Sequence, residues 1–346
     1  MTSQEPPRIA AAPPLTIRPF APGDEAAVLA CHNAVFAPPG AGRAERTLAH
    51  WRWKFAANPT GRVLQMLAVA GSGDVVGVYA ALPVAVTCDG RRALAAQALD
   101  HCVRPEWLRH GGENGLFAEL GQAFLARWLG TNGDQVLFLY GLPVASWRGG
   151  ARHLGWQIAR DWDATFRDVT AATPPRSVPG AVVVRRVECF DADTTALFTR
   201  LEPDLGVATV RDAGYLNWRY AAHPERRYTL FECRERAGGA LRGWCVYTTG
   251  DVGRPHTSYL VDWLFPADDA EAMVALLAAC EDAARTDGTG LLCSVCNPMD
   301  PRFLAIQELG YRVRGTPWFL ALRTARYDTV FFREHWHFTL GDSDLV

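Results

Sequence analysis

The sequence predicts a layered α/β (α+β) protein made of two copies of one fold, each a mixed, mostly antiparallel sheet flanked by helices. The main observation is an internal repeat, because Trp-Lys-Phe-Ala-Ala-Asn-Pro at 53–59 returns as Trp-Arg-Tyr-Ala-Ala-His-Pro at 218–224. A second, shorter repeat relates Leu-Gly-Trp at 154–156 to Leu-Gly-Tyr at 309–311. The copies lie 165 (218 − 53) and 155 (309 − 154) residues apart. This period suits a duplicated domain and is too long for a solenoid repeat of about 20–50 residues.

Length and composition predict a soluble protein of the reducing cytoplasm. The 346 residues are 49% hydrophobic and 21% charged, with a formal net charge of −2. A net charge so close to zero gives the molecule no overall positive potential that would attract nucleic acid or an anionic membrane. No apolar stretch is long enough to span a bilayer. The nine cysteines lack framework spacing. Because Cys293 and Cys296 have no second pair beside them, we expect buried thiols and no metal site.

The first half is expected at 15–170, after a proline-rich tail at 1–14 that should be disordered. Apolar spacing predicts the first helix, and Asn58-Pro59 stops the second. Glycine-containing turns then separate the strands of a meander. In chain order we expect strand 15–20, helices 22–36 and 47–55, strands 63–70, 75–86 and 93–103, helix 115–128, strand 136–140, helix 146–154 and strand 157–166.

The second half, 181–346, repeats this order after an expected linker at 171–180 that is rich in Pro, Thr and Ala. We expect strand 182–187, helices 193–201 and 213–220, strands 228–234, 241–249 and 257–265, helix 267–286, strand 291–296, helix 301–309 and two final strands. The segment 336–346 alternates aromatic and polar residues and should be packed. Its Asp342 and Asp344 either form a solvated acidic turn or attract a cationic amine to a cleft between the domains.

This order of elements resembles the GNAT superfamily of N-acetyltransferases, and most of all bacterial members with two such folds in tandem. The supporting motifs are Val103-Arg104-Pro105-Glu106, Gly115-Leu116-Phe117 and Gly141-Leu142-Pro143. The resemblance covers nearly everything from Leu15 onward. It implies that acyl-CoA lies where the fourth strand diverges from the fifth, with its pyrophosphate at the start of the following helix. Free N–H groups and the helix dipole make such a terminus an anion site.

The resemblance implies a phosphate loop at 109–115 in the first half. Arg109 and Gly112 fit the family pattern, whereas Asn114 stands where Gly or Ala is usual. Asn tolerates a left-handed backbone better than most residues. The full set of expected cofactor-binding residues is Cys102, Val103, Arg109, His110, Gly111, Gly112, Asn114 and Gly115.

The same place in the second half is acidic. Asp268, Asp269 and Glu271 crowd the first turn of the helix there, and no glycine is present. Such carboxylates cap the helix and repel a pyrophosphate. We therefore expect acetyl-CoA in the first half, and a structural or substrate-shaping role for the second.

The family's catalytic base is commonly an acid on the fourth strand, which the resemblance places at Asp100, with His101 beside it. An ion pair between Asp100 and a neighbouring arginine is the equal alternative. Strand alternation would put Asp100 and Cys102 on one face and His101 and Val103 on the other. On that basis only one of the two sets can face the cleft.

A group that protonates the leaving thiolate is less well marked. Many relatives have a Tyr on the helix after the fifth strand, and this sequence has none there. Tyr140, at the end of the preceding strand, is the substitute within reach. Ser146 either contacts the cofactor or, as the plainer alternative, caps its helix.

The leading hypothesis is an N-acyltransferase, most simply an acetyltransferase with acetyl-CoA as donor, whose small amine substrate attacks the thioester directly. One alternative is a non-catalytic pair of degenerate folds that binds a ligand or partner. Another is an aminoacyl-tRNA-dependent transferase of the Fem type, which also pairs such folds, although the near-neutral charge offers little for tRNA to hold. No nucleic acid, membrane or metal is expected as a partner.

Overall fold

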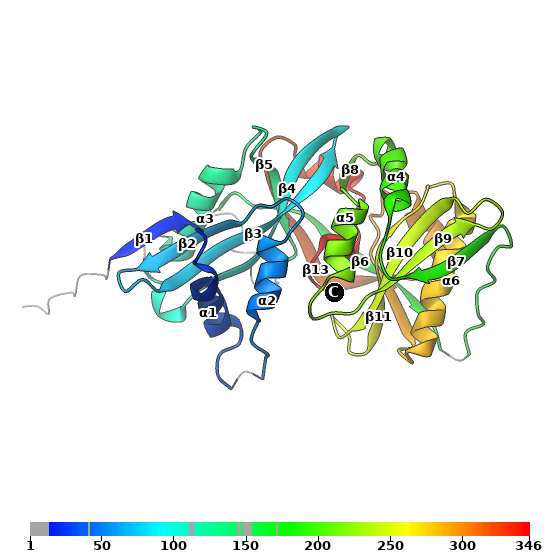
Figure 1. Ribbon diagram of the computed structural model, residues 1–346, viewed down its shortest axis with the longest axis horizontal. Coiled ribbons are helices and arrows are strands. Elements are labelled where there is room, and N and C mark those ends of the chain that lie inside the picture. The colour runs from blue at the N-terminus through cyan, green and yellow to red at the C-terminus, as the bar shows by residue number, and fades with distance from the viewer. Residues whose placement is uncertain (1–13, 41, 111–113, 144–146, 148–153, 171) are drawn as a thin grey trace, which may run out of the picture.

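The computed structural model describes residues 14–40, 42–110, 114–143, 147, 154–170 and 172–346. Within these residues the strands form one continuous sheet that runs through both halves. Figure 1 shows the N-terminal half, in blue and cyan, beside the C-terminal half, in green to orange, with the C-terminus between them. Two of the strand pairs are parallel and the others antiparallel. The expected layered α/β fold with mixed, mostly antiparallel strands is confirmed.

The first half follows the expected order. Thr47 accepts a hydrogen bond from the amide of His50 and so begins the second helix. The helix expected at 146–154 lies largely outside the described residues. The elements are β1 (Leu15–Pro19), α1 (Glu25–Phe36), α2 (Leu48–Trp51), the π-helical turn η1 (Arg52–Ala56), β2 (Leu64–Ala70), β3 (Val75–Cys88), β4 (Arg91–Val103), the 3₁₀ turn η2 (Pro105–Trp107), α3 (Gly115–Trp128), β5 (Val136–Gly141) and β6 (Gln157–Asp168).

The second half repeats the order and differs at its end. Its elements are β7 (Val182–Val187), α4 (Ala192–Leu201), η5 (Glu202–Asp204), β8 (Val207–Thr209), α5 (Ala213–Leu216), η6 (Asn217–Ala221), β9 (Thr229–Glu235), β10 (Leu241–Gly250), β11 (Thr257–Leu264), α6 (Ala270–Thr286), β12 (Leu291–Ser294), α7 (Arg302–Glu308), β13 (Arg312–Thr324), α8 (Thr329–His335) and η7 (Leu340–Asp342). The expectation of two final strands was wrong. Asp328 accepts from the amide of Phe331 and starts a helix after β13 instead.

The two halves exchange their last strands. The sheet order is β1-β2-β3-β4-β5-β13-β6-β12-β11-β10-β9-β7, with β8 added to β3. β13 from the second half lies antiparallel between β5 and β6, and β6 from the first half pairs with β12. Arg323 of β13 donates to the carbonyl of Leu154 (3.0 Å), and Arg167 of β6 donates to that of Gly310 (3.4 Å). The sheet therefore does not divide at 171–180, although the two halves are copies.

The repeated aromatic segments meet at the contact between the halves. Trp53 Nε1 donates to the carbonyl of Trp218 (2.8 Å), and Trp218 Nε1 donates to the carbonyl of Trp53 (2.9 Å). The two rings stack with centroids 5.2 Å apart. Because identical groups contact each other reciprocally, the repeat marks an approximate twofold axis.

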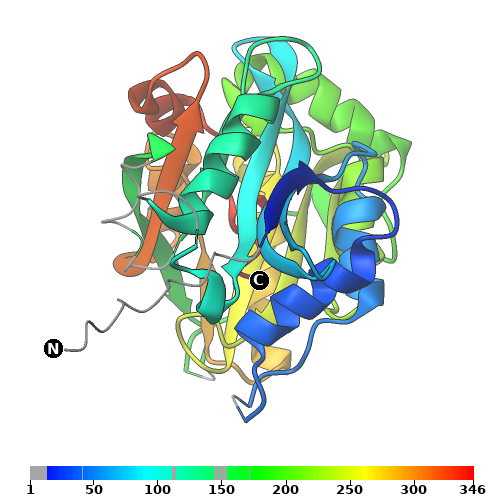
Figure 2. The same ribbon diagram turned by 90° about the vertical axis from the view of Figure 1, so that its left-hand side faces the viewer.

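Helices α1 and α3 lie on opposite sides of the first-half sheet (Figure 2). An apolar layer fills the space on each side. The α1 layer includes Cys31 and Trp51, and the α3 layer includes Leu120 and Phe124. The α1 layer continues into the second half and takes in Trp336 of the C-terminal segment. The α1 side of the first half therefore shares one core with the end of the chain.

The cysteines and helices bear on two further expectations. All nine cysteines lie in the described residues as free thiols, and eight of them are buried, so the expected core thiols are confirmed apart from the exposed Cys189. Among the described residues, no helix has both the length and the apolar character needed to cross a membrane.

Candidate active site

The candidate site lies where β4 and β5 diverge. The two parallel strands are paired only as far as Gln97 and Tyr140. A Cβ added to Gly141 would lie 3.1 Å from the carbonyl oxygen of Ala98, so glycine permits close approach at the point of divergence. A cavity of about 330 Å³ opens beyond it, lined by Phe36, Ala98, Leu99, Asp100, His101, Phe117, Gly141, Leu142, Pro143, Trp147, Trp156, Ala321 and Asp344.

This cavity reaches both faces of the sheet. Phe36 belongs to α1 and packs against the α1 layer. Phe117, Trp147 and Trp156 pack in the α3 layer. The cavity therefore gives access to one point from two sides, as a reaction between two separately bound molecules requires.

Asp100 and His101 both line this cavity, from opposite faces of β4, and a β-bulge lies at Asp100. In the β3–β4 ladder, residues 99–102 lie opposite residues 78–80, so β4 holds one residue more than β3. Asp100 takes up the extra length with a left-handed φ of +55°. The alternation expected from Asp100 to Val103 is present, with Asp100 and Cys102 on the α1 side and His101 and Val103 on the α3 side. Both Asp100 and His101 nevertheless line the cavity, because the cavity reaches both faces of the sheet.

Cations surround the Asp100 carboxylate. Arg46 Nη1 donates to Oδ2, Lys54 Nζ lies 3.1 Å from the same oxygen, and His32 Nε2 lies 3.8 Å from Oδ1. Burial by itself would raise the pKa of Asp100, but the charge of Lys54, together with His32 and Arg46, holds this pKa well below its usual value. A carboxylate with so low a pKa is a weak proton acceptor. The ion-pair alternative therefore describes Asp100 better than a free general base does.

The His101 ring lies on the α3 side, stacked on Tyr79 with centroids 3.8 Å apart. Its Nε2 is 2.8 Å from the carbonyl oxygen of Ala80, so the neutral ring carries its hydrogen on Nε2 and its lone pair on Nδ1. Burial lowers the pKa of His101 to about 4. At physiological pH this side chain is therefore neutral.

Asp344 reaches the cavity from the end of the chain. Its carboxylate accepts a hydrogen bond from Gln97 Nε2 (3.2 Å) and lies 3.3 Å from Lys54 Nζ. The side chain nevertheless remains 44% exposed. Asp342, which the sequence grouped with it, is buried in the second half. Asp344 is therefore the member of this pair that a ligand can reach.

Three other predicted residues do not line this cavity. Cys102 packs in the α1 layer with its Sγ 3.9 Å from that of Cys31, and Val103 packs in the α3 layer. Tyr140 points into the α1 layer, where its ring lies 4.9 Å from that of Trp336, and burial raises the pKa of Tyr140 well above its usual value. Tyr140 therefore does not line the cavity, which begins one residue after it, and its role as a thiolate acid stays a prediction that this placement does not support.

The predicted phosphate loop and Ser146 are described only in part. Gly111, Gly112 and Ser146 lie outside the described residues. Arg109 and His110 lie within them, after η2, and neither lines the cavity. Their predicted contacts with a cofactor stay predictions.

The start of α3 leaves its amides open. Gly115, the first residue of α3, has φ +75°, and a Cβ there would lie 2.9 Å from the carbonyl oxygen of Leu108. Asn114 precedes it, and its side chain makes no capping hydrogen bond within the described residues. The first turn also contains no acidic residue. Among the described residues no side chain caps these amides, as an anion-binding helix start requires.

At the start of α6, the equivalent position in the second half, acidic side chains of the protein itself occupy the anion site, as the sequence predicted. Asp269 accepts a hydrogen bond from the amide of Ala272 (2.9 Å). Arg242 donates to both oxygens of Asp269 (2.6 and 2.8 Å) and to Glu271 (2.9 Å). The second half therefore satisfies its helix start with its own side chains.

The C-terminal segment also fills the cleft of the second half. His337 Nε2 lies 3.3 Å from the carbonyl oxygen of Trp263, which is in β11. Asn297, just after β12, donates to the carbonyl of Trp336 (2.8 Å). Residues 336–343 thus bridge the ends of the two strands that correspond to β4 and β5.

A buried carboxylate that holds this segment should make it sensitive to acid. Asp300 lies 3.2 Å from His337 Nδ1 and 2.9 Å from Arg302 Nη1. Burial would raise the pKa of Asp300, but His337 and Arg302 lower it to about 2. Because the folded-state pKa is below the unfolded value of about 3.9, the stabilisation is present above about pH 4 and is lost as the pH falls towards 2.

We therefore expect Asp300→Asn to be less stable than the wild type, by a margin that narrows by about 1 kcal/mol between pH 5 and pH 3. Urea unfolding of both proteins at the two pH values measures this margin. A margin independent of pH would contradict the ion pair.

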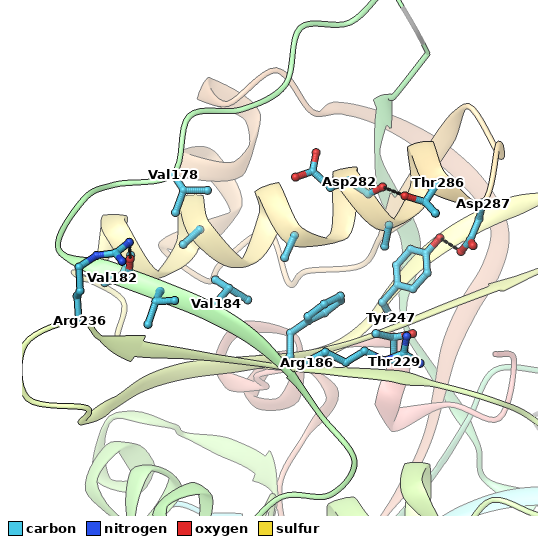
Figure 3. A pocket seen from close by; sticks show the side chains of 15 residues that line it. Val178, Val182, Val184, Arg186, Thr229, Arg236, Tyr247, Asp282, Thr286 and Asp287 are labelled. Atoms are coloured by element: carbon cyan, nitrogen blue, oxygen red, sulfur yellow. Dashed lines mark hydrogen bonds between the residues drawn. The ribbon is translucent and has the colours of Figure 1, made fainter.

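A larger cavity, of about 570 Å³, lies elsewhere in the second half, between α6 and strands β7, β9 and β10 (Figure 3). Two of its polar side chains are bonded within the protein. Tyr247 donates to Asp287 (2.7 Å), and Arg236 donates to the carbonyl of Val182 (3.0 Å). This cavity lies over a sheet face and not at a divergence of strands, so the β4–β5 cavity is the better candidate site.

Several residues of the site were missed in the sequence. Extending the repeat backwards from Trp53 aligns Arg46 with Arg211, a signal that was available. Lys54 lies inside the repeated segment itself. Ala321 carried no signal, because it reaches the site through the exchanged strand β13.

No family model and no curated protein matches the sequence. Solved structures do resemble it. A probable N-acyltransferase from Enterococcus faecalis V583 has a TM-score of 0.65 at 14% identity, covering 91% of this chain and 74% of that one. Saccharomyces cerevisiae N-myristoyltransferase with bound myristoyl-CoA has a TM-score of 0.57 at 11% identity, covering 94% and 82%. A tandem GNAT protein from the clavulanic acid biosynthesis pathway has a TM-score of 0.53 at 18% identity, covering 91% and 100%. The chain therefore has the tandem GNAT fold that its repeated elements predicted.

Proposed function

We propose that the protein is an acyl-CoA-dependent N-acyltransferase, most simply with acetyl-CoA as donor and a small amine as acceptor. The observation that carries this proposal is the open β4–β5 cavity, which reaches both faces of the sheet in the first half. In the second half the C-terminal segment crosses between the corresponding strand ends, and the cavity of about 420 Å³ beside it is lined by Asp268 and Asp300. The similar N-myristoyltransferase was solved with an acyl-CoA bound, which supports a CoA thioester as donor.

The donor binds on the α3 side. The open amides at the start of α3 suit the pyrophosphate of CoA. Phe117, Trp147 and Trp156 provide an apolar wall for the pantetheine arm and the acyl group. Beyond Gln97 the edge of β4 has left its partner β5, so its backbone groups are free to bond the pantetheine amides and the thioester carbonyl.

The acceptor enters from the α1 side, where Asp344 attracts its ammonium group. Asp344 accepts the ammonium proton, directly or through a water molecule, because its side chain is far more exposed than that of Asp100, whose Oδ2 is engaged by both Arg46 and Lys54. The freed nitrogen attacks the thioester carbonyl, the new C–N bond forms, and the C–S bond breaks while the nitrogen releases its second proton to water. CoA leaves as a thiolate, and because a free thiol has a pKa near about 8.5, water can protonate it without a dedicated acid.

Titration with acetyl-CoA, combined with the release of CoA thiol in the presence of amines, tests the proposal. We expect Asp344→Asn to keep the Kd for acetyl-CoA and to lose about 100-fold in kcat/KM for the amine. Asp134→Asn, in an exposed turn, is the matched control and should match the wild type in both measurements. Absence of acetyl-CoA binding, or full activity of Asp344→Asn, would refute the proposal.

A non-catalytic, ligand-binding role is the second candidate. It is favoured by the ion-paired state of Asp100 and by the burial of Tyr140 away from the cavity. Acetyl-CoA binding without thiol release for any amine would support this second role.

A further inference from the structure

The duplication allows the filled cleft of the second half to be compared with the open cleft of the first. Arg46 and Arg211 are aligned by the repeat, and each comes directly before the N-cap residue of the helix that follows, α2 or α5. Each arginine bonds a carboxylate on the corresponding strand of its own half. Arg46 donates to Asp100 of β4, and Arg211 Nε donates to Asp262 of β11 (2.9 Å). The two clefts therefore contain the same arginine–aspartate pair.

In the second half this pair holds the C-terminal segment as a ligand. Arg211 Nη2 donates to Asp342 (2.7 Å) and to Thr339 (3.1 Å), and the Thr339 hydroxyl donates to Asp262 (2.8 Å). The backbone at Gly341 lies so close that an added Cβ would be 2.6 Å from Asp262 Cγ. A peptide that bears a carboxylate thus occupies the second cleft and contacts both members of the pair.

In the first half the pair has no such ligand. Among the described residues the guanidinium of Arg46 bonds Asp100 alone, and the Arg46 side chain is 18% exposed. Arg211, by contrast, is fully buried beneath Asp342 and Thr339. Arg46 therefore has N–H donors free for a ligand beside a carboxylate that lines the cavity.

We propose that the acceptor is an amine that also carries a carboxylate, such as an amino acid or a short peptide, and that this carboxylate binds Arg46 as Asp342 binds Arg211. This inference rests on the proposed function of the cleft. The planar guanidinium matches a carboxylate with two parallel hydrogen bonds. The ammonium group of the same molecule faces Asp344, which lies on the other side of Lys54. Opposite charges at the two ends of the site suit a zwitterion.

Pairs of acceptors that differ only in the carboxylate test this inference. With saturating acetyl-CoA, kcat/KM is measured by thiol release for leucine against isoamylamine, phenylalanine against phenethylamine, and lysine against cadaverine. We expect the amino acid to be preferred at least about tenfold in each pair that is turned over, because a site built for a hydrogen-bonded group rejects analogues that lack it.

The variants separate recognition from folding. Arg46→Lys keeps the charge beside Asp100 and is expected to raise the KM of the amino acid at least about tenfold, while the Kd for acetyl-CoA stays unchanged. Arg46→Gln should abolish the preference, and a thermal melt reports whether it folds. Arg43→Lys, at an exposed position, is the control and should keep the preference.

Equal rates within the pairs, or a preference that survives both Arg46 variants, would overturn the inference. Acetyl-CoA binding without transfer to any of the six amines would also overturn it and would leave the donor site standing. Absence of acetyl-CoA binding would instead remove the proposed function, so the two failures are distinguishable.

Discussion

Replacing Asn114 by aspartate is expected to weaken acetyl-CoA binding at least about tenfold without lowering the melting temperature. Asn114 precedes α3 and makes no capping hydrogen bond. An aspartate there would cap the first turn as Asp269 caps α6. A carboxylate at this terminus stabilises a helix by about 0.3–1 kcal/mol, and it also competes with a pyrophosphate for the same amides. Ligand affinity and stability should therefore change in opposite directions.

Isothermal titration with acetyl-CoA and thermal melts of Asn114→Asp check this result. Asn132→Asp places the same charge in an exposed turn after α3 and serves as the control. If both variants bind acetyl-CoA equally weakly, the loss of affinity comes from the change in overall charge and not from the position of the new carboxylate. If Asn114→Asp binds as tightly as the wild type, acetyl-CoA does not lie at the start of α3.

Asp342→Ala is expected to lower the free energy of unfolding by about 3–5 kcal/mol, because it breaks a buried ion pair from one side. Arg211 and Asp342 are 0% and 2% exposed. Asp342 also accepts hydrogen bonds from the Thr209 hydroxyl (2.6 Å) and the Thr339 amide (2.9 Å). The variant leaves all three donors without this acceptor in a core that excludes water.

Urea unfolding measures this loss, and Asp344→Ala is the matched control. Asp344 is far more exposed, so Asp344→Ala should lower the free energy of unfolding by less than about 1 kcal/mol. The same variant should impair amine transfer. Asp342→Ala should retain acetyl-CoA binding, because the donor site that we propose lies in the first half. Equal stability of the two variants would mean that the C-terminal segment is not clamped in the second cleft.

Both expectations follow from a difference between the halves, and the sequence by itself determined most of that difference. The repeat at 53–59 and 218–224, the order of elements and the acids at the start of α6 are local patterns. Asp269 bonds an amide only three residues away, so its neighbours in the chain suffice to predict the cap. The fold class and the filled anion site of the second half were accordingly predictable.

The tertiary structure alone decided which side chains share the cavity. The bulge at Asp100 depends on how β4 pairs with β3, and alternation within one strand does not reveal that the cavity is lined from both faces of β4. Asp100 forms ion pairs with Lys54 and Arg46, both of which come much earlier in the chain. Asp344 contacts Lys54 across a sequence separation of 290 residues, and only the exchanged strands and the packed C-terminal segment bring the two together. Contacts of this range leave no local pattern, because they depend on the packing of both halves at once.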